Sequence, residues 1–180
     1  MRHSTLVELG ARWLRRRCSV VLTELSATPE IPDAIGWADG VSSILIECKV
    51  TRADFLRDRA KSARKKTNAG MGNRRYYLCL ANVIQIADLP AKWGLLWVEQ
   101  GQITVQREAR GIPQRNLLAE VRYLSTMLRR AQIRIGSRPL SEWLRGENRF
   151  EAVRGITPNR AASRSNLITG VESRPPRRAM

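Results

Sequence analysis

Three charged residues, Asp33, Glu47 and Lys49, stand in or beside apolar segments, and their types suit one kind of chemistry. In a strand over residues 44–50, Glu47 and Lys49 would share one face, because side chains alternate along a strand. A half-buried pair of this sort is costly unless a charged partner binds there. Carboxylates can hold Mg²⁺ or Mn²⁺ against a phosphate, and an ammonium can orient water or offset negative charge. We therefore interpret the three as catalytic residues of a phosphodiester hydrolase, with Asp33 and Glu47 as metal ligands.

This interpretation places a condition on the hairpin that joins the two strands. Asp39-Gly40 is a strong turn signal. A plain two-residue turn there would put Asp33 opposite Ile46, and Asp33 and Glu47 would then point to opposite faces. One extra residue, as in a bulge, would set Asp33 opposite Glu47. The hydrolase interpretation therefore predicts a bulged or odd-length turn.

The segments around these residues resemble the PD-(D/E)xK nuclease superfamily, since Ile31-Pro32-Asp33 is followed by Ile46-Glu47-Cys48-Lys49. Residues 50–61 are similar to the MmcB-related DNA-repair branch and to phage endonuclease-like proteins. The similarity runs from about Leu22 to Val105. Residues 62–65 depart from the Trp-Pro-x-Tyr-type segment of the repair branch, which favours the phage-like relatives. The resemblance implies a restriction-endonuclease-like core, Mg²⁺ (or Mn²⁺) as cofactor, Asp33 and Glu47 as ligands, and Lys49 as the catalytic lysine.

Four further charged residues are secondary candidates. The resemblance implies a carboxylate at the end of the first strand, where this chain has Glu24, and it draws attention to Asp58 and Lys61 as groups near the metal or a phosphate. Charge stripes on helices are more often solvated faces with i,i+4 pairs. Glu8 occupies the first helix, where superfamily members often carry another metal-site carboxylate. It also completes a capping box with Thr5, and we prefer that interpretation.

The charge balance predicts a polyanionic partner. Lys and Arg total 32 against 16 Asp and Glu, which gives a formal net charge of +16. Such an excess attracts phosphate backbones, and arginine suits bidentate phosphate contacts. DNA is favoured over RNA as the partner. The candidate nucleic-acid contacts are Arg52, Lys65, Arg74 and Arg75, although turn chemistry explains the glycines beside the last two equally well. A catalytically inactive nucleic-acid-binding protein with the nuclease fold and a basic scaffold protein remain alternatives.

Other classes of site and location are disfavoured. His3 is the only histidine and stands near the N-terminus, so neither a histidine general base nor a zinc site is expected. The three cysteines have no metal-ligand or disulfide spacing, which is typical of a reducing cytoplasm. No apolar run is long enough to cross a membrane, and we expect a cytoplasmic protein without membrane partners. Cutting both strands of DNA would favour a homodimer, but the sequence leaves the oligomeric state open.

The hydrophobic pattern predicts a mixed α/β fold with a central mixed sheet flanked by helices. The expected order is helix, three strands, helix, strand, hairpin and helix. The first helix opens at Thr5 and the last runs from Gln114 to about Arg134, with Leu117, Val121 and Leu128 on one side. We assign residues 1–146 to a nuclease-like domain, whose helical C-terminal part covers about 114–145. Residues 147–180 are expected to form a flexible basic tail.

Overall fold

The computed structural model describes residues 1–26, 31–38, 42–61 and 69–136, together with the single residues 64, 139 and 141. Its elements all fall within one compact unit, Met1–Ser137. The predicted basic tail lies outside the described residues. The elements are α1 (His3–Arg15), β1 (Val20–Thr23), β2 (Ala34–Trp37), β3 (Ser43–Cys48), α2 (Arg52–Arg59), β4 (Arg74–Leu80), η1 (Ile86–Asp88), β5 (Gly94–Glu99), β6 (Gln102–Arg107) and α4 (Leu117–Ile135).

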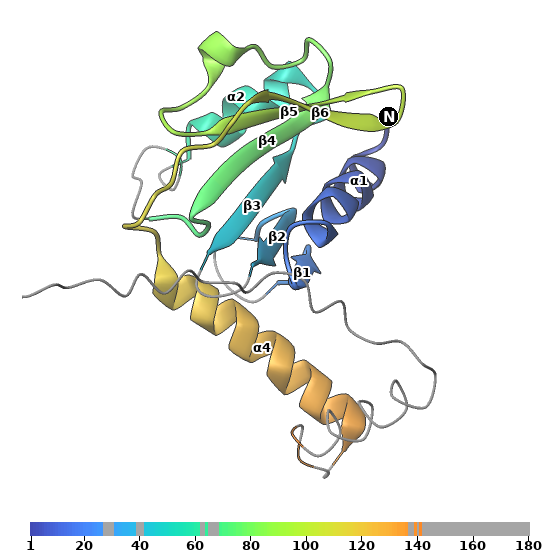
Figure 1. The fold of residues 1–180 in the computed structure, drawn as a ribbon, viewed down its shortest axis with the longest axis vertical. Coiled ribbons are helices and arrows are strands. Elements are labelled where there is room, and N and C mark those ends of the chain that lie inside the picture. Colours follow the sequence, from blue (N-terminus) through green and yellow to red (C-terminus); the bar gives the residue numbers. More distant parts are fainter. Residues whose placement is uncertain are drawn as a thin grey trace, which may run out of the picture. The chain divides into compact units, whose positions relative to one another are not determined.

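The described strands form one six-stranded sheet in the order β1-β2-β3-β4-β5-β6 (Figure 1). β1, β2 and β3 pair antiparallel, β3, β4 and β5 pair parallel, and β6 returns antiparallel to β5. The predicted mixed sheet is therefore confirmed. The parallel pairs need crossover connections, and α2 lies in the connection from β3 to β4.

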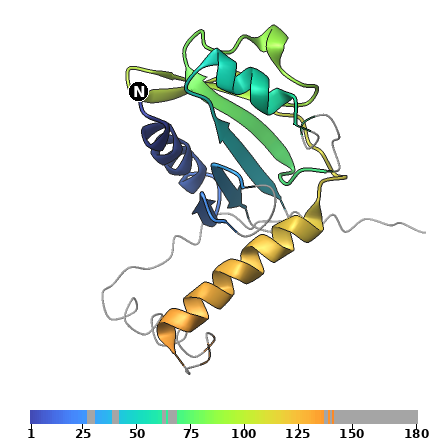
Figure 2. The same cartoon turned by 180° about the vertical axis from the view of Figure 1, so that it is seen from behind.

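Each face of the sheet carries its own core. On one face α1 packs through Leu6, Val7 and Leu14 against the side chains of Ile46 and Leu78. On the other face α2 inserts Phe55 beside Tyr77, whose ring stacks on Trp93 with centroids 4.5 Å apart. Figures 1 and 2 show α1 and α2 on opposite sides of the sheet. The central strand β3 is therefore covered on both faces, and every one of its residues is buried.

The register of β2 on β3 meets the condition drawn from the sequence. Ala34 pairs with Ile46 and Trp37 with Ser43, so an odd number of residues separates the two strands. Continued by one residue, the same register sets Asp33 opposite Glu47. Residues opposite each other in a sheet point to the same face. The predicted odd-length connection is confirmed.

Helix α4 is attached to the sheet by a buried carboxylate. Glu120 is 1% exposed and accepts hydrogen bonds from Trp37 Nε1 at 3.2 Å, Ser43 Oγ at 3.0 Å, the Gly72 N–H at 2.9 Å and Arg115 Nε at 2.8 Å. The predicted helix is confirmed, but it begins at Leu117 because Asn116 caps it by accepting from the Ala119 N–H. Its apolar stripe is not part of the core, since Leu117, Val121 and Leu128 are about half exposed.

Helix α1 does not begin where the sequence predicted. Helix α1 begins at His3, and its N-cap residue, Arg2, makes no side-chain cap hydrogen bond, so the capping box proposed at Thr5 is wrong. No helix in the described ranges combines the length and the apolar character that a bilayer crossing requires.

Candidate active site

The chemistry-bearing residues gather where the central strand β3 ends. Glu47 is the second-to-last residue of β3. It lies on the same face of the sheet as Leu45 and is paired in register with Tyr77 of β4. Lys49 follows the strand, and its backbone N–H still donates to Leu78 O at 2.9 Å. Both side chains are nearly buried, with 4% of Glu47 and 10% of Lys49 exposed. The predicted pair therefore sits inside the fold, where an unpaired charge would be costly.

Asp33 is held beside this pair by the backbone of β3. Its Oδ2 accepts a hydrogen bond of 2.6 Å from the Cys48 N–H. The ammonium of Lys49 lies 4.0 Å from that oxygen and 3.2 Å from Glu47 Oε2. The structure thus brings the three predicted catalytic residues together around one ammonium group.

Asp58 is a third carboxylate in the same cluster, delivered by the last turn of α2. It is 3% exposed, and its Oδ1 lies 3.6 Å from Lys49 Nζ and 2.9 Å from Lys61 Nζ. Its Oδ2 accepts a hydrogen bond of 2.9 Å from the Tyr77 hydroxyl. Lys61 is 65% exposed, so only its ammonium contacts the cluster. The secondary candidates Asp58, on this helix, and Lys61, two residues after it, therefore contact the same cluster as Lys49.

Two members of the cluster were missed by sequence reasoning, Arg64 and Tyr77. The Arg64 guanidinium is 2.8 Å from Asp58 Oδ2 and 2.8 Å from Glu47 Oε1, and it lies over the Trp93 ring at 5.2 Å. In the sequence it is one of several basic residues after α2, and only its 3% side-chain exposure distinguishes it. Tyr77 reads as an ordinary apolar strand residue until β4 is paired with β3. Neither carried a local signal.

Burial and charge act against each other on the ionisable groups. Burial raises the pKa of Glu47 to about 7, although Arg64 and Lys49 oppose the shift. Burial alone would lower the pKa of Lys49, but Glu47, Asp58 and Asp33 together raise it above its ordinary value. Burial alone would raise the pKa of Asp58, but Arg64 and Lys49 hold that pKa well below its usual range. Lys49 is therefore a firmly charged ammonium between carboxylates.

The donor set fits a hard divalent cation. Asp33 and Glu47 supply the carboxylate oxygens that Mg²⁺ and Mn²⁺ prefer. Among the described side chains, Glu47 Oε1 is a buried oxygen that accepts no hydrogen bond, although Arg64 Nη2 lies 2.8 Å away as an ion pair. An ion bound at this oxygen would replace the Arg64 contact.

The other secondary carboxylates lie apart from Lys49. Glu24 follows β1 and is 54% exposed, and its Oε1 is 3.6 Å from His3 Nδ1. His3 Nε2 is in turn 3.4 Å from Asp33 Oδ1. The histidine dismissed from the sequence thus stands beside the candidate site. Glu8 is exposed on α1 and is not brought to the cluster.

The candidate nucleic-acid contacts divide by burial. Arg74 is exposed, as a phosphate contact requires. Arg52 is exposed but forms a two-pronged pair with Asp88, at 2.6 and 2.7 Å. The expectation for Arg75 is corrected, because its side chain is 1% exposed and donates to the backbone carbonyls of Gly72 and Gly70. It braces the loop before β4 and does not offer its charge at the surface. Lys65 lies outside the described residues.

Comparison with known proteins identifies a fold relative but no activity. No family model matches the chain, and no curated protein matches it. A solved structure of a protein of unknown function from Silicibacter pomeroyi is similar in fold, with a TM-score of 0.56 and 21% sequence identity. The similarity covers 78% of this chain and 97% of that chain. The arrangement of a mixed sheet flanked by helices is thus shared with a solved protein of unknown function.

Proposed function

We propose that this protein is a divalent-metal-dependent endonuclease that hydrolyses phosphodiester bonds, with DNA as its substrate in preference to RNA. The proposal includes a restriction-endonuclease-like core and membership of the PD-(D/E)xK superfamily. It is carried by one observation: the Lys49 ammonium lies within 4.0 Å of carboxylate oxygens from Asp33, Glu47 and Asp58. Three acidic groups and a buried lysine are a costly set to assemble in a fold interior, and clusters of perturbed ionisable groups are a feature of functional sites.

In this proposal each residue has a separate task. Asp33 and Glu47 would hold Mg²⁺ or Mn²⁺, which when bound lowers the pKa of a water and neutralises charge on the phosphate. Lys49, which is charged and fixed, would orient the attacking water or stabilise the negative charge that develops in the transition state. Asp58 and Arg64 are positioning residues, because they contact Lys49 and Glu47 rather than the substrate.

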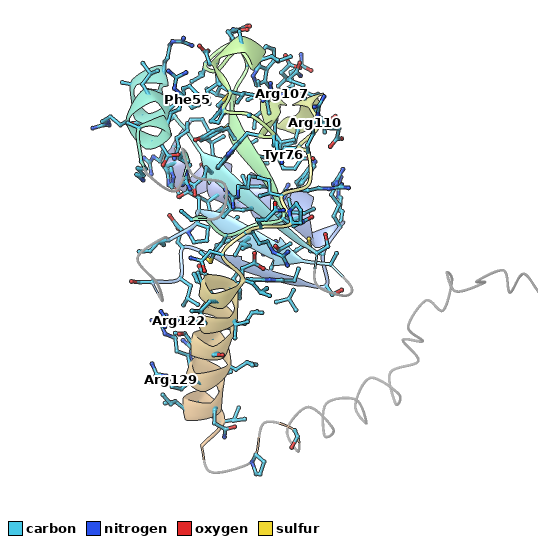
Figure 3. The ribbon with its side chains drawn as sticks, turned by 90° about the vertical axis from the view of Figure 1, so that its left-hand side faces the viewer. Phe55, Tyr76, Arg107, Arg110, Arg122 and Arg129 are labelled. Carbon is cyan, nitrogen blue, oxygen red and sulfur yellow. The ribbon has the colours of Figure 1, made fainter. Side chains whose placement is uncertain are left out.

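The basic surface would supply affinity for the DNA backbone. The net charge of +16 favours phosphate binding through counterion release. Exposed arginines are available for this on several elements, including Arg110 after β6 and Arg122 and Arg129 on α4 (Figure 3). Binding of this type weakens steeply as salt rises, and a flat salt response would contradict any nucleic-acid function.

A cleavage assay tests the proposal. Plasmid, single-stranded and branched DNA are incubated with wild-type protein and Mg²⁺ or Mn²⁺, then with Lys49→Met and Asp33→Asn. The asparagine keeps an oxygen for the Cys48 N–H, so the local hydrogen bond is preserved. The matched control is Asp54→Asn, a carboxylate on α2 whose partners are Thr51 and Arg57 rather than the cluster. We expect metal-stimulated cleavage that both site variants lose, by about 100-fold or more, and that the control retains.

A catalytically inactive nucleic-acid-binding protein is the second candidate, and one observation favours it. Glu47 is 3% exposed and already engaged by Lys49 and Arg64, so the cluster neutralises its own charges without a metal. If wild-type protein binds DNA with a steep salt dependence but cuts none of these substrates with either metal, the hydrolase proposal is rejected in favour of this one.

A further inference from the structure

A second group of ligand-type side chains meets the other oxygen of Asp33. His3 begins α1, Glu24 follows β1 and Asp33 precedes β2, so three separate elements contribute to it. His3 Nδ1 lies 3.6 Å from Glu24 Oε1, and His3 Nε2 lies 3.4 Å from Asp33 Oδ1. One potential ligand atom from each residue lies within 4.8 Å of the other two. The imidazole of α1 thus stands between two carboxylates that lie at the two ends of the connection between β1 and β2.

The backbone fixes this arrangement. The Glu24 N–H donates to Asp33 O at 3.2 Å, which ties the two carboxylate-bearing segments together. Because Asp33 Oδ2 is occupied by the Cys48 N–H at 2.6 Å, its Oδ1 is the oxygen presented to His3. Helix α1 is held to the sheet by buried residues such as Leu6 and Val7, so His3 is attached to a fixed element.

We propose that His3, Glu24 and Asp33 bind a divalent first-row transition-metal ion. This site would prefer Mn²⁺ or Zn²⁺ over Mg²⁺. An imidazole beside two carboxylates is a donor set that such ions accept, whereas Mg²⁺ favours oxygen ligands alone and keeps several waters. Ligand atoms about 2.1 Å from a metal lie roughly 3–4 Å apart, so the three ligand atoms, which lie within 4.8 Å of one another, would move closer together to share an ion. The side chains of His3 and Glu24 are 43% and 54% exposed, which leaves them free to adjust and open to an ion from solvent.

Only the catalytic consequence of this ion rests on the proposed function, because Asp33 would then be shared by the ion at His3 and Glu24 and the ion at Glu47. Metal binding by His3 and Glu24 does not itself require hydrolysis. The ion would place a positive charge beside the carboxylate that the proposed reaction uses, and it would make the enzyme respond to which metal is supplied.

The single histidine makes the test specific. Full-length protein without a polyhistidine tag is titrated with Mn²⁺ and followed by electron paramagnetic resonance, and the bound ion is examined for nitrogen hyperfine coupling. His3 is the only histidine in the chain, so imidazole coupling can come from no other residue. We expect such coupling in wild type. We expect His3→Ala to abolish it, and His3→Ala and Glu24→Gln each to weaken Mn²⁺ binding by roughly 10-fold or more. Glu8→Gln, an exposed carboxylate on the same helix as His3, is the matched control and should change nothing.

The outcomes separate this inference from the proposed function. Bound Mn²⁺ without nitrogen coupling, or with an affinity that His3→Ala leaves unchanged, overturns the inference even if DNA is cut. Displacement of Mn²⁺ by an equal concentration of Mg²⁺ overturns the stated preference. Binding of Mn²⁺ that depends on His3 in a protein that cuts no DNA sustains the inference while the proposed function fails.

Discussion

Replacing Asp58 with asparagine would remove one negative charge from the buried cluster while keeping its shape. Asp58 faces Arg64 at 2.8 Å and Lys49 at 3.6 Å, and the side chains of these two cations are 3% and 10% exposed. Removing one partner of a buried ion pair typically costs about 3–5 kcal/mol, because the remaining charge stays desolvated without compensation. The ion pair between Lys61 and Asp58 adds little to the cost of the substitution, since an exposed ion pair contributes at most about 1 kcal/mol.

The expected cost is at the lower end of that range, about 3 kcal/mol at neutral pH, because Glu47 still compensates both cations. Urea denaturation measures it as a lower midpoint with an unchanged slope. Asp54→Asn, on the same helix, should lower the midpoint much less, because the partners of Asp54, Thr51 and Arg57, are at the surface. If Asp58→Asn costs no more than this control, the cluster does not depend on Asp58 and the reasoning fails.

The pH dependence of the same variant provides a second check. Opposing charges from Arg64 and Lys49 outweigh burial and hold the pKa of Asp58 below its ordinary value of 3.8. A lowered pKa contributes stability above the unfolded-state value, and that stability is lost as the pH falls through the folded-state value. The difference between wild type and Asp58→Asn should therefore be constant at neutral pH and shrink as the pH falls below about 4. A difference that widens in acid would contradict the assignment.

Three further predictions concern other parts of the fold. Gly94→Ala should cost about 3 kcal/mol or more in thermal unfolding, because the added Cβ would overlap the buried Tyr76 ring. Gly111→Ala should be nearly neutral, because its added Cβ would make only an ordinary contact of 3.9 Å with Asn73 Oδ1. Glu120→Gln should cost about 2 kcal/mol in urea unfolding, because an amide nitrogen cannot accept from the buried donors that this carboxylate serves; an unchanged midpoint would refute the anchoring role of Glu120. The pKa of Glu47 is raised to about 7, so protonation of Glu47 contributes stability that is present below the unfolded-state pKa of 4.5 and is lost as the pH rises through about 7. Glu47→Gln should therefore flatten the dependence of stability on pH between these two values. An equally steep dependence in that variant would contradict the raised pKa.

The features that followed from local pattern were accessible from the sequence. Alternation along residues 44–50 predicted that Ile44, Ile46 and Cys48 share one face of the strand, and in β3 these three residues pack in the same core cluster. Parity of the connection between β2 and β3 set the face of Asp33, because the period of a strand is two residues. These inferences needed only the spacing of residues within one hairpin.

The features that depended on packing between distant segments were not accessible. Arg64 looks like any other member of a basic stretch, and its role appears only when α2 is placed over β3 and β4. Arg75 was interpreted as a surface arginine because it follows glycines, but it is the second residue of the central strand β4 and is buried there. The apolar stripe of α4 predicted the helix correctly, but the stripe did not reveal that Glu120 and Tyr123 are the buried residues of this helix.

The odd number of residues between Trp37 and Ser43 determines that Asp33 and Glu47 point to the same face of the sheet. Lengthening or shortening that connection by one residue while the strands stay paired would turn either Asp33 or Glu47 to the side of the sheet covered by α1. Changes by two residues would preserve the facing of both carboxylates. Length variation in this hairpin should therefore be tolerated in even steps only, even where its residue types are free to drift.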